Sequence, residues 1–237
     1  MISSWSSLIR ETSPKAPAQR AGPFAFPILL REVLQRLEGQ SGTPRTTLTR
    51  IRLEIAASEL LQDLDFHALR ITDICTRADC GHGTFYRYWT DRENVAREIM
   101  MDFMEAIRLC RPPPPARTRL FDRLLAGHRY YVEMFRRNAG LMRCLNQLSI
   151  ELPGFNDIGA QANLRLAHRV VSAFEREAPP EPGTERQRLA MALNCIAMVD
   201  GVLRNCFVHN ADVGLSDEDL AEQLSRIWYR SFLARDP

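Results

Sequence analysis

Apolar residues recur at helical spacing along most of the chain, and no stretch alternates between polar and apolar residues over a useful length. Ile51, Ile55 and Leu60 fall on one face of a segment that begins near Thr46 and ends near Leu64. An apolar face of this kind predicts an amphipathic helix that packs against a core. The pattern therefore indicates an all-α fold.

Clusters of glycine, proline and asparagine divide the rest of the chain into further helices. The proline run at 112–115 cannot continue a helix, and it gives the clearest boundary within the ordered part of the chain. Ser216, followed by Asp219, resembles a helix N-cap with an acidic first turn. The helices that we expect span 27–38, 46–64, 71–78, 92–109, 117–137, 140–150, 156–178, 184–209 and 216–235.

Composition narrows the class of protein. Hydrophobic residues make up 45% of the 237 residues and aromatic residues 8%, which is typical of a globular protein with a sizeable core. The chain has no run of about 18 apolar residues and no secretory signal pattern, so we expect a cytoplasmic protein without a membrane span. Its six cysteines include no C-x-x-C pair, which predicts reduced, buried thiols and no metal site. The net charge of +2 does not indicate a partner.

The segment 73–94 combines helix breakers with a dense aromatic run. A short helix over 71–78 ends at a turn, Asp79–Gly81, and a second helix begins near His82 or Gly83. Two short helices joined by a turn of three or four residues form a helix-turn-helix, whose second helix can enter the major groove of DNA. The alternative is a packed helical hairpin with aromatic filling, and the residues alone leave both interpretations open.

On a helical wheel, Phe85 and Trp89 fall together, and this predicts that they anchor the second helix to the core. The residues on the opposite face and on the flanks are Gly83, Thr84, Tyr86, Arg87 and Tyr88. Their hydroxyl groups can hydrogen-bond phosphates, the glycine lets the backbone approach a duplex, and arginine to guanine is the commonest specific base contact. This arrangement is the one that a groove-reading helix needs.

Residues 51–97 resemble the DNA-binding domain of the tetracycline-repressor (TetR) family of bacterial transcription regulators. The matching pieces are AASELL (56–61), ITDIC (71–75), GTFYRYW (83–89) and DRENV (91–95). The last two carry most of the specificity of the match. The resemblance implies a homodimer that binds a near-palindromic operator in double-stranded DNA and responds to a small-molecule effector.

The resemblance also implies roles for individual residues. Hydroxyl groups of the second helix are expected to contact phosphates, while its first residues and its arginine lie near the bases. Arg92, which opens the next helix, is placed to hold a phosphate. The full set of expected DNA-binding residues is Arg70, His82, Gly83, Thr84, Tyr86, Arg87, Tyr88 and Arg92.

Several positions depart from the family pattern. Asp65 and Asp79 stand where the family usually has glycine, and aspartate tolerates the left-handed conformation better than most residues. Leu69 and Arg70 stand where serine or threonine usually caps the second helix, and Arg70 could act as a new phosphate contact. Gly81 replaces the usual serine or threonine at the start of the reading helix, where glycine is an acceptable N-cap.

Two C-terminal segments have the apolar pattern of a dimer interface. The first, 190–208, has few charges, and the second, 218–233, has one apolar face. That face consists of Leu220, Leu224, Ile227 and Trp228. Two such helices from each of two chains would form a four-helix interface, and the alternative is a core within one chain.

Seven of the eight methionines lie between residues 100 and 198, where they and nearby aromatic residues could line a flexible apolar pocket. The effector-binding residues expected on this basis are Met104, Phe121, Tyr130, Met134, Met142, Phe174 and Met198. Asp200, in an apolar helix, either makes a polar contact or faces outward. His128, His168 and His209 are too far apart in sequence to indicate a metal site. No constellation of nucleophile and base is visible, so we expect neither catalysis nor a cofactor.

These observations predict three parts. Residues 1–44 form an extension that is largely disordered, with a short helix near 27–38. Residues 45–92 form a three-helix, helix-turn-helix DNA-binding domain. Residues 93–237 form a helical domain for effector binding and dimerisation. The expected function is that of a ligand-responsive repressor in the bacterial cytoplasm, associated with the nucleoid and released from DNA by a small apolar effector.

Two alternatives stay open on the sequence. One is an all-helical protein that binds hydrophobic ligands without binding DNA, and the other is a redox-sensing regulator that acts through Cys75 or Cys80. The helix at 27–38 is unusual for the family. It could extend the grip on DNA, with Arg45 or Arg50 near the minor groove, it could cover the dimer, or it could reflect a start codon placed too far upstream.

Overall fold

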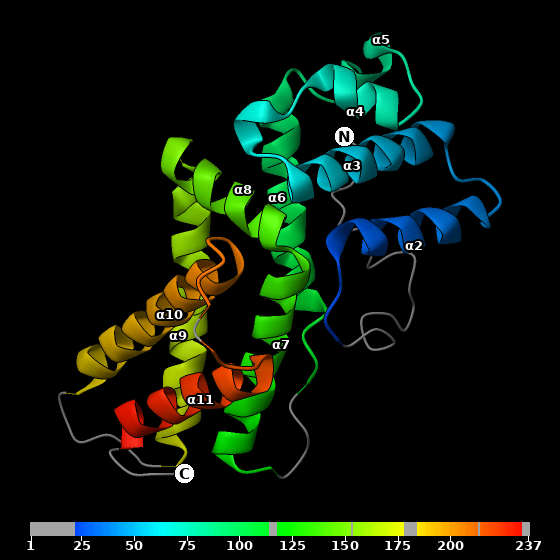
Figure 1. The fold of residues 1–237 in the computed structure, drawn as a ribbon. Helices are drawn as coiled ribbons and strands as arrows, with labels where there is room; N and C mark the ends of the chain where they lie inside the picture. Colours follow the sequence, from blue (N-terminus) through cyan, green and yellow to red (C-terminus); the bar gives the residue numbers. More distant parts are fainter. Residues whose placement is uncertain (1–21, 114–117, 153, 178–183, 213, 234–237) are drawn as a thin grey trace. The chain divides into compact units, whose positions relative to one another are not determined.

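The computed structural model describes residues 22–113, 118–152, 154–177, 184–212 and 214–233, and all secondary structure in these ranges is helical (Figure 1). The predicted all-α fold is confirmed. The elements are α2 (Phe26–Glu38), α3 (Arg45–Asp63), the 3-10 turn η2 (Phe66–Ala68), α4 (Ile71–Arg77), α5 (His82–Phe85), α6 (Arg92–Leu109), α7 (Leu120–Arg137), α8 (Ala139–Glu151), α9 (Phe155–Glu175), α10 (Glu185–Phe207) and α11 (Asp217–Leu233). The disorder expected for the first residues, 1–21, lies outside the described residues.

The chain divides into two compact units, which we call the N-terminal unit and the C-terminal unit. The N-terminal unit consists of Met1–Pro112 and Arg137–Leu148, and the C-terminal unit consists of Pro113–Arg136 and Ser149–Pro237. The chain therefore passes between the units after residues 112, 136 and 148. The functional boundary predicted at residue 92 falls inside the N-terminal unit, at the start of α6, and it stays a prediction.

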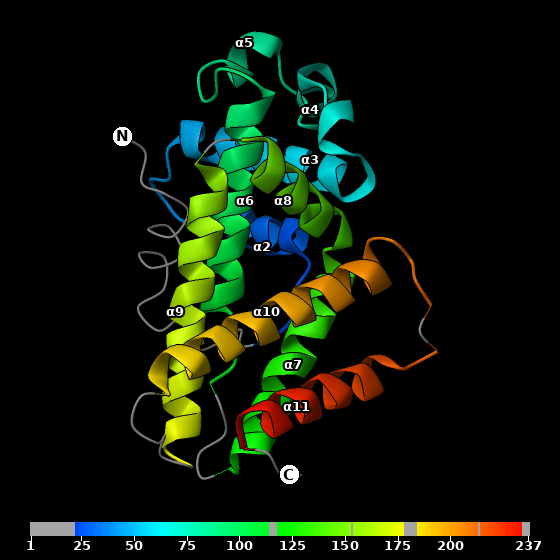
Figure 2. The ribbon, with the colours of Figure 1, turned by 90° about the vertical axis from the view of Figure 1, so that its left-hand side faces the viewer.

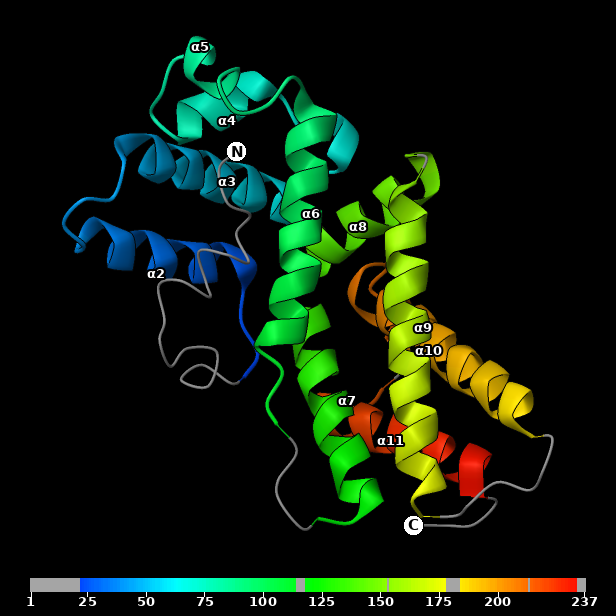
Figure 3. The same cartoon turned by 180° about the vertical axis from the view of Figure 1, so that it is seen from behind.

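Helix α2 belongs to the core of the N-terminal unit. Figures 1 and 3 show that it runs along α3 on the side away from α4 and α5. Phe26, Leu30 and Leu37 on α2 are 1%, 1% and 3% exposed. The Phe26 ring lies 5.4 Å, between centroids, from the ring of Phe103 on α6. Because α2 lies behind α3 as seen from α4 and α5, its position argues against the hypothesis that it extends the grip on DNA.

The beginning of α8 packs directly on the end of α3. Gly140 is buried there, and a Cβ atom added to it would lie 2.1 Å from the carbonyl oxygen of Gln62. The Gln62 side-chain amide donates to the Arg137 carbonyl at 3.2 Å, and the Phe66 N–H donates to Gln147 Oε1 at 3.1 Å. These contacts join the beginning of α8 to the N-terminal unit.

In the C-terminal unit, α10 runs across α9 and α11 lies beside α10 (Figure 2). A buried histidine lies between α7 and α11: His128 Nδ1 is 2.8 Å from Ser225 Oγ, and its ring makes an edge contact with Trp228 at 4.9 Å between centroids. His168 and His209 are exposed. Among the residues that the structure describes, no group of three or more His, Cys, Asp or Glu side chains could hold a metal ion.

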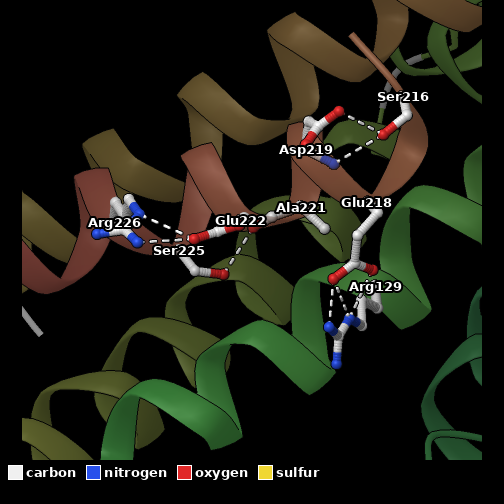
Figure 4. Close-up of polar contacts among 8 residues, drawn as sticks. All are labelled: Arg129, Ser216, Glu218, Asp219, Ala221, Glu222, Ser225 and Arg226. Atoms are coloured by element: carbon white, nitrogen blue, oxygen red, sulfur yellow. Dashed lines mark hydrogen bonds and ion pairs between the residues drawn. The ribbon is translucent and has the colours of Figure 1, made fainter.

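Polar contacts fix the first turns of α11 (Figure 4). The Asp219 N–H donates to Ser216 Oγ at 3.1 Å, and the Ser216 hydroxyl donates to Asp219 Oδ2 at 2.6 Å. The predicted N-cap is therefore confirmed. From α7, Arg129 Nε donates to Glu218 Oε2 at 2.7 Å, which joins α11 to α7.

The predicted apolar face of the last helix is divided between core and surface. Leu220, Leu224 and Trp228 are 6%, 2% and 6% exposed inside the C-terminal unit, whereas Ile227 is 43% exposed. The interpretation of all four side chains as a dimer interface is therefore wrong for the three buried ones. An amphipathic pattern reports burial, and it does not say whether the partner is the same chain or another.

Candidate nucleic-acid interface

Helices α4 and α5 form the predicted helix-turn-helix. Helix α4 ends at Arg77, and Asp79 has a φ of 51°, so the left-handed conformation expected at this position is confirmed. The Cys80 N–H donates to the Cys75 carbonyl at 3.0 Å across the turn. Gly81 then serves as the N-cap of α5, as predicted.

We call residues 82–89 the reader segment. Its regular helix, α5, is a single turn, but helical hydrogen bonds continue beyond it, because the N–H groups of Tyr88 and Trp89 both donate to the Phe85 carbonyl, at 2.9 and 3.2 Å. Phe85 and Trp89 are 0% and 1% exposed, and their rings lie 5.5 Å apart. The prediction that these two rings anchor the segment is confirmed.

The outer face of the reader segment is open to solvent. Tyr86 is 57% exposed, and His82, Gly83 and Arg87 are exposed as well, while Thr84 is half-buried. A Cβ atom added to Gly83 would meet nothing within 4 Å. Packing inside the chain therefore does not require a glycine here, whereas close approach of the backbone to a partner would.

Tyr88 has a partner within the chain. Its hydroxyl donates to the Thr46 carbonyl, near the start of α3, at 2.9 Å. A phosphate oxygen only accepts hydrogen bonds, so the one hydroxyl hydrogen of Tyr88 cannot serve Thr46 and a phosphate together. The predicted phosphate contact of Tyr88 stays a prediction, and it would require this internal bond to break.

The two other expected phosphate contacts, Arg70 and Arg92, differ in their surroundings. Arg70 is exposed and occupies the N-cap position of α4 without a capping side-chain bond. Arg92 Nη1 donates to the His67 carbonyl at 2.8 Å, and its guanidinium lies 5.2 Å from the centroid of the Phe66 ring. Arg92 therefore joins α6 to the turn before α4, and its phosphate role stays a prediction.

Asp65 does not adopt the conformation that the family comparison suggested. Its φ of −68° and ψ of 152° are extended, so no left-handed residue is needed at this turn. Its Oδ1 atom instead lies 2.8 Å from Nε of Arg143 on α8. An ion pair between α8 and the turn after α3 accounts for an aspartate at this position.

Behind the reader segment, a charged network joins α3, Trp89 and α6. Arg50 Nε donates to Glu54 Oε1 at 2.9 Å, and Arg50 Nη2 donates to Glu98 Oε2 at 2.6 Å. Trp89 Nε1 donates to the same Glu98 oxygen at 2.7 Å, and the Arg50 guanidinium lies 5.3 Å from the centroid of the Trp89 ring. The minor-groove contact suggested for Arg50 stays a prediction, and it would require these donors to leave the anchor of the reader segment. Sequence reasoning missed Glu98, whose partners come from two other segments.

The network also contains an excess of acid. Glu54 is 5% exposed, and burial raises its pKa to about 7 although Arg50 opposes the shift. Burial, followed by the negative charge of Glu54, raises the pKa of Asp102 on α6 to about 8. The folded N-terminal unit therefore keeps protons on two carboxyl groups close to neutral pH.

Asp102→Asn is expected to stabilise the N-terminal unit by about 1–3 kcal/mol near pH 8.5. The pKa of Asp102 is raised in the folded state, so the stability that its proton provides is fully present below the unfolded pKa and is lost as pH rises through about 8. Asparagine keeps the shape and does not ionise. In urea unfolding, the advantage of the variant should grow from about pH 4 to about pH 8 and then level off. An advantage that does not vary with pH would contradict this account.

The expected effector-binding residues are divided between the units. Met104 and Met142 belong to the N-terminal unit, and the others, Phe121, Tyr130, Met134, Phe174 and Met198, belong to the C-terminal unit. Met134 and Phe174 are 0% exposed, and Tyr130 and Met142 are 5% exposed. These four are core residues of their units, and a role for any of the seven in a pocket stays a prediction.

Asp200 makes a polar contact and does not simply face outward, so the first of the two interpretations left open by the sequence is confirmed. The Tyr131 hydroxyl on α7 donates to Asp200 Oδ1 on α10 at 2.8 Å. Burial raises the pKa of Asp200, and the hydrogen bond from Tyr131 opposes this. Burial and then the charge of Asp200 raise the pKa of Tyr131 well above its usual value. The lone acid in an apolar helix was the sequence signal for this pair.

The redox alternative loses support at Cys75. This cysteine is 2% exposed, and burial, together with the neighbouring Cys80, raises the pKa of its thiol to about 11. The thiolate is the reactive form of cysteine, and little of it exists at neutral pH when the pKa is this high.

The sequence model for "Bacterial regulatory proteins, tetR family" matches residues 55–99, which contain the whole helix-turn-helix. Residues 55–99 therefore form a DNA-binding domain of the tetR-family type. This part of the chain thus has the helix-turn-helix of bacterial regulatory proteins.

Solved structures show the same fold beyond the matched domain. One is the crystal structure of a TetR-like transcriptional regulator from Rhodococcus sp. RHA1, with a TM-score of 0.58 and 15% identity over 81% of this chain and 99% of that chain. Another is the dihydroxyacetone kinase operon activator DhaS, with a TM-score of 0.51 and 17% identity over 81% and 99% of the two chains. A search of the curated proteins finds no match.

Proposed function

We propose that this tetR-family regulator is a ligand-responsive repressor that binds a near-palindromic operator as a homodimer in the bacterial cytoplasm, at the nucleoid. The observation that carries the proposal is the open outer face of the reader segment, held from behind by Phe85 and Trp89. The major groove admits such a segment, and two readers of a two-fold dimer fit successive grooves about one helical turn apart. Arg87 and His82 supply groups that can reach base edges.

Helix α10 supports the homodimer. By length and composition it could cross a membrane, with a mean hydropathy of 1.3 over its most apolar 18 residues, and only 28% of that window is buried within the chain. Met191 is 38% exposed, and a Cβ atom on Gly201 would meet nothing within 4 Å. One such helix is weak ground for a membrane protein. We propose that this surface, with Ile227 on α11, packs against a second copy of the chain.

The C-terminal unit supports an effector site of largely apolar character. Tyr131 and Asp200 give it one half-buried polar pair, which would orient a small apolar molecule that carries a hydrogen-bonding group. The proposed transmitter is α6, because Glu98 on this helix holds the reader anchor Trp89. A coupling of about 1–3 kcal/mol between effector and operator corresponds to a loss of DNA affinity of about 5- to 150-fold.

The decisive experiment is selection of genomic DNA fragments by the purified full chain, followed by sequencing. The proposal expects enriched fragments that share an inverted repeat, with half-sites about one helical turn, or about 10 base pairs, apart. Fragments no more enriched than random DNA would favour the alternative of a hydrophobe-binding protein without DNA binding. A reporter gene behind an enriched fragment then gives the direction of regulation. A fall in transcription supports the repressor, and a rise matches the activity in the name of DhaS.

Tyr86→Phe is expected to weaken binding to operator and to random DNA alike, by about 5-fold for the loss of roughly 1 kcal/mol of phosphate hydrogen bonding. Tyr86 is 57% exposed, so the melting temperature should not change. Tyr88→Phe is the matched variant, because its hydroxyl donates to Thr46 and its loss should lower the melting temperature. Fluorescence anisotropy with both DNAs measures the first effect. A loss confined to the operator would exclude Tyr86 from phosphate binding.

A further inference from the structure

The first described residues are attached to the N-terminal unit at two places. The Gly22 N–H donates to the Cys110 carbonyl, just beyond the end of α6, at 3.0 Å. Asn138, which is 0% exposed, uses both ends of its amide: Nδ2 donates to the Phe24 carbonyl, and Oδ1 accepts from the Phe26 N–H, each at 2.8 Å. One buried side chain thus fixes both the position and the direction of the backbone that leads into α2.

Both attachment points lie beside passages of the chain between the two units. Cys110 lies two residues before the passage that follows Pro112, and Asn138 lies two residues after the passage that begins at Arg136. The segment 22–26, which leads into α2, is therefore hydrogen-bonded within two residues of two separate inter-unit passages.

The rest of α2 lies against α3, the first helix of the DNA-binding domain. Buried side chains along α2, among them Leu30 and Leu37, supply most of the stabilisation, because burial of apolar area outweighs exposed ion pairs. At the surface, Arg52 Nη2 on α3 lies 2.7 Å from Glu38 Oε1 on α2. Helix α3 in turn carries Arg50, which holds the reader anchor.

We propose that α2 is a positioning element for operator recognition. Asn138 fixes the start of α2 relative to the inter-unit passages, and α2 in turn sets the placement of α3 and of the reader segment. This role differs from that of α6, because α6 acts on Trp89 through Glu98, whereas α2 acts on the opposite side of α3. The inference rests on the proposed function, since it concerns how two readers match two half-sites.

The test compares Asn138→Ala with a matched control, Ser58→Ala, in the full chain. Ser58 is also 0% exposed, but its hydroxyl donates to the Glu54 carbonyl within its own helix, at 2.7 Å, so the control removes a buried polar group without removing a hydrogen bond to the segment that leads into α2. Affinities for operator and for random DNA are measured well below the melting temperature of each variant. We expect Asn138→Ala to lose about 5-fold or more in operator affinity with random-DNA affinity unchanged, because misplaced readers still meet phosphates.

If Asn138 has a purely structural role, Asn138→Ala should behave like Ser58→Ala: its melting temperature should fall, and its affinities for operator and for random DNA should stay intact. That result would overturn the proposal. An equal loss on operator and random DNA would also overturn it, because the reader itself would then be damaged. The distance between spin labels placed at the exposed position 90 of the two chains gives a readout without DNA. We expect a broader distribution for Asn138→Ala than for Ser58→Ala. If no operator exists but the distribution broadens, the proposed function fails, and only the placement of the reader segment by Asn138 and α2 survives.

Discussion

Gly140→Ala is expected to destabilise the N-terminal unit by about 3 kcal/mol or more, the upper end of what overpacking costs. The added Cβ atom would lie 2.1 Å from the carbonyl oxygen of Gln62 and 2.4 Å from its Cα. Both are backbone atoms, so no side-chain rotation relieves the clash, and α8 must move away from the end of α3. For a chain of this size, the melting temperature should fall by about 6–12 °C in differential scanning calorimetry.

Gly159→Ala is the matched control for this substitution. Gly159 also lies inside a helix, α9, but a Cβ atom there would meet nothing within 4 Å. Alanine favours a helix over glycine by about 0.5–1 kcal/mol, so the control should be slightly more stable than the natural chain. If both variants melted at the same temperature, the close packing of α8 on α3 would be refuted.

Arg87→Ala is expected to reduce operator affinity by about 10- to 100-fold and to relax base preference at one position in each half-site. Arg87 is exposed on the open face of the reader segment, and a good arginine–base contact is worth about 1–3 kcal/mol of discrimination. Binding to random DNA should fall much less, because it depends on phosphate contacts. Selection from a randomised DNA library, with anisotropy on the selected sequences, measures both effects.

Arg169→Ala provides the control for the change in charge. Arg169 is exposed on α9 in the C-terminal unit, so its removal alters the net charge equally without touching the reader segment. Its sequence preference should match that of the natural chain. An unaltered sequence preference in Arg87→Ala as well would remove Arg87 from base readout.

The sequence predicted the features that depend on local periodicity. The helices were found within a few residues because apolar residues recur at the period of an α-helix. The anchoring by Phe85 and Trp89 followed from the same rule, since residues four apart share a helix face. The left-handed Asp79 followed from the need to turn between two short helices.

Features that depend on long-range contacts could not be predicted from the sequence. Glu98 was missed because Trp89 and Arg50 reach it from segments that no local pattern relates to it. The internal bond of Tyr88 was missed because its acceptor is a main-chain carbonyl, and a carbonyl carries no residue-specific signal. Leu224 was predicted to lie in the dimer interface but lies in the core of the C-terminal unit, because hydrophobicity indicates burial and does not show which surface buries the side chain.

Residues 137–148 belong to the N-terminal unit although they are separated from it in the sequence. This limits how chimeras between this protein and other regulators can be made. A chimera that joins residues up to 112 to a foreign sensor would leave out Asn138 and Gly140, and with them the surface on which α2 and α3 rest. The DNA-reading module is discontinuous in the gene. Exchange of specificity between such regulators would therefore succeed only if the crossover carries the start of α8 along with the first 112 residues.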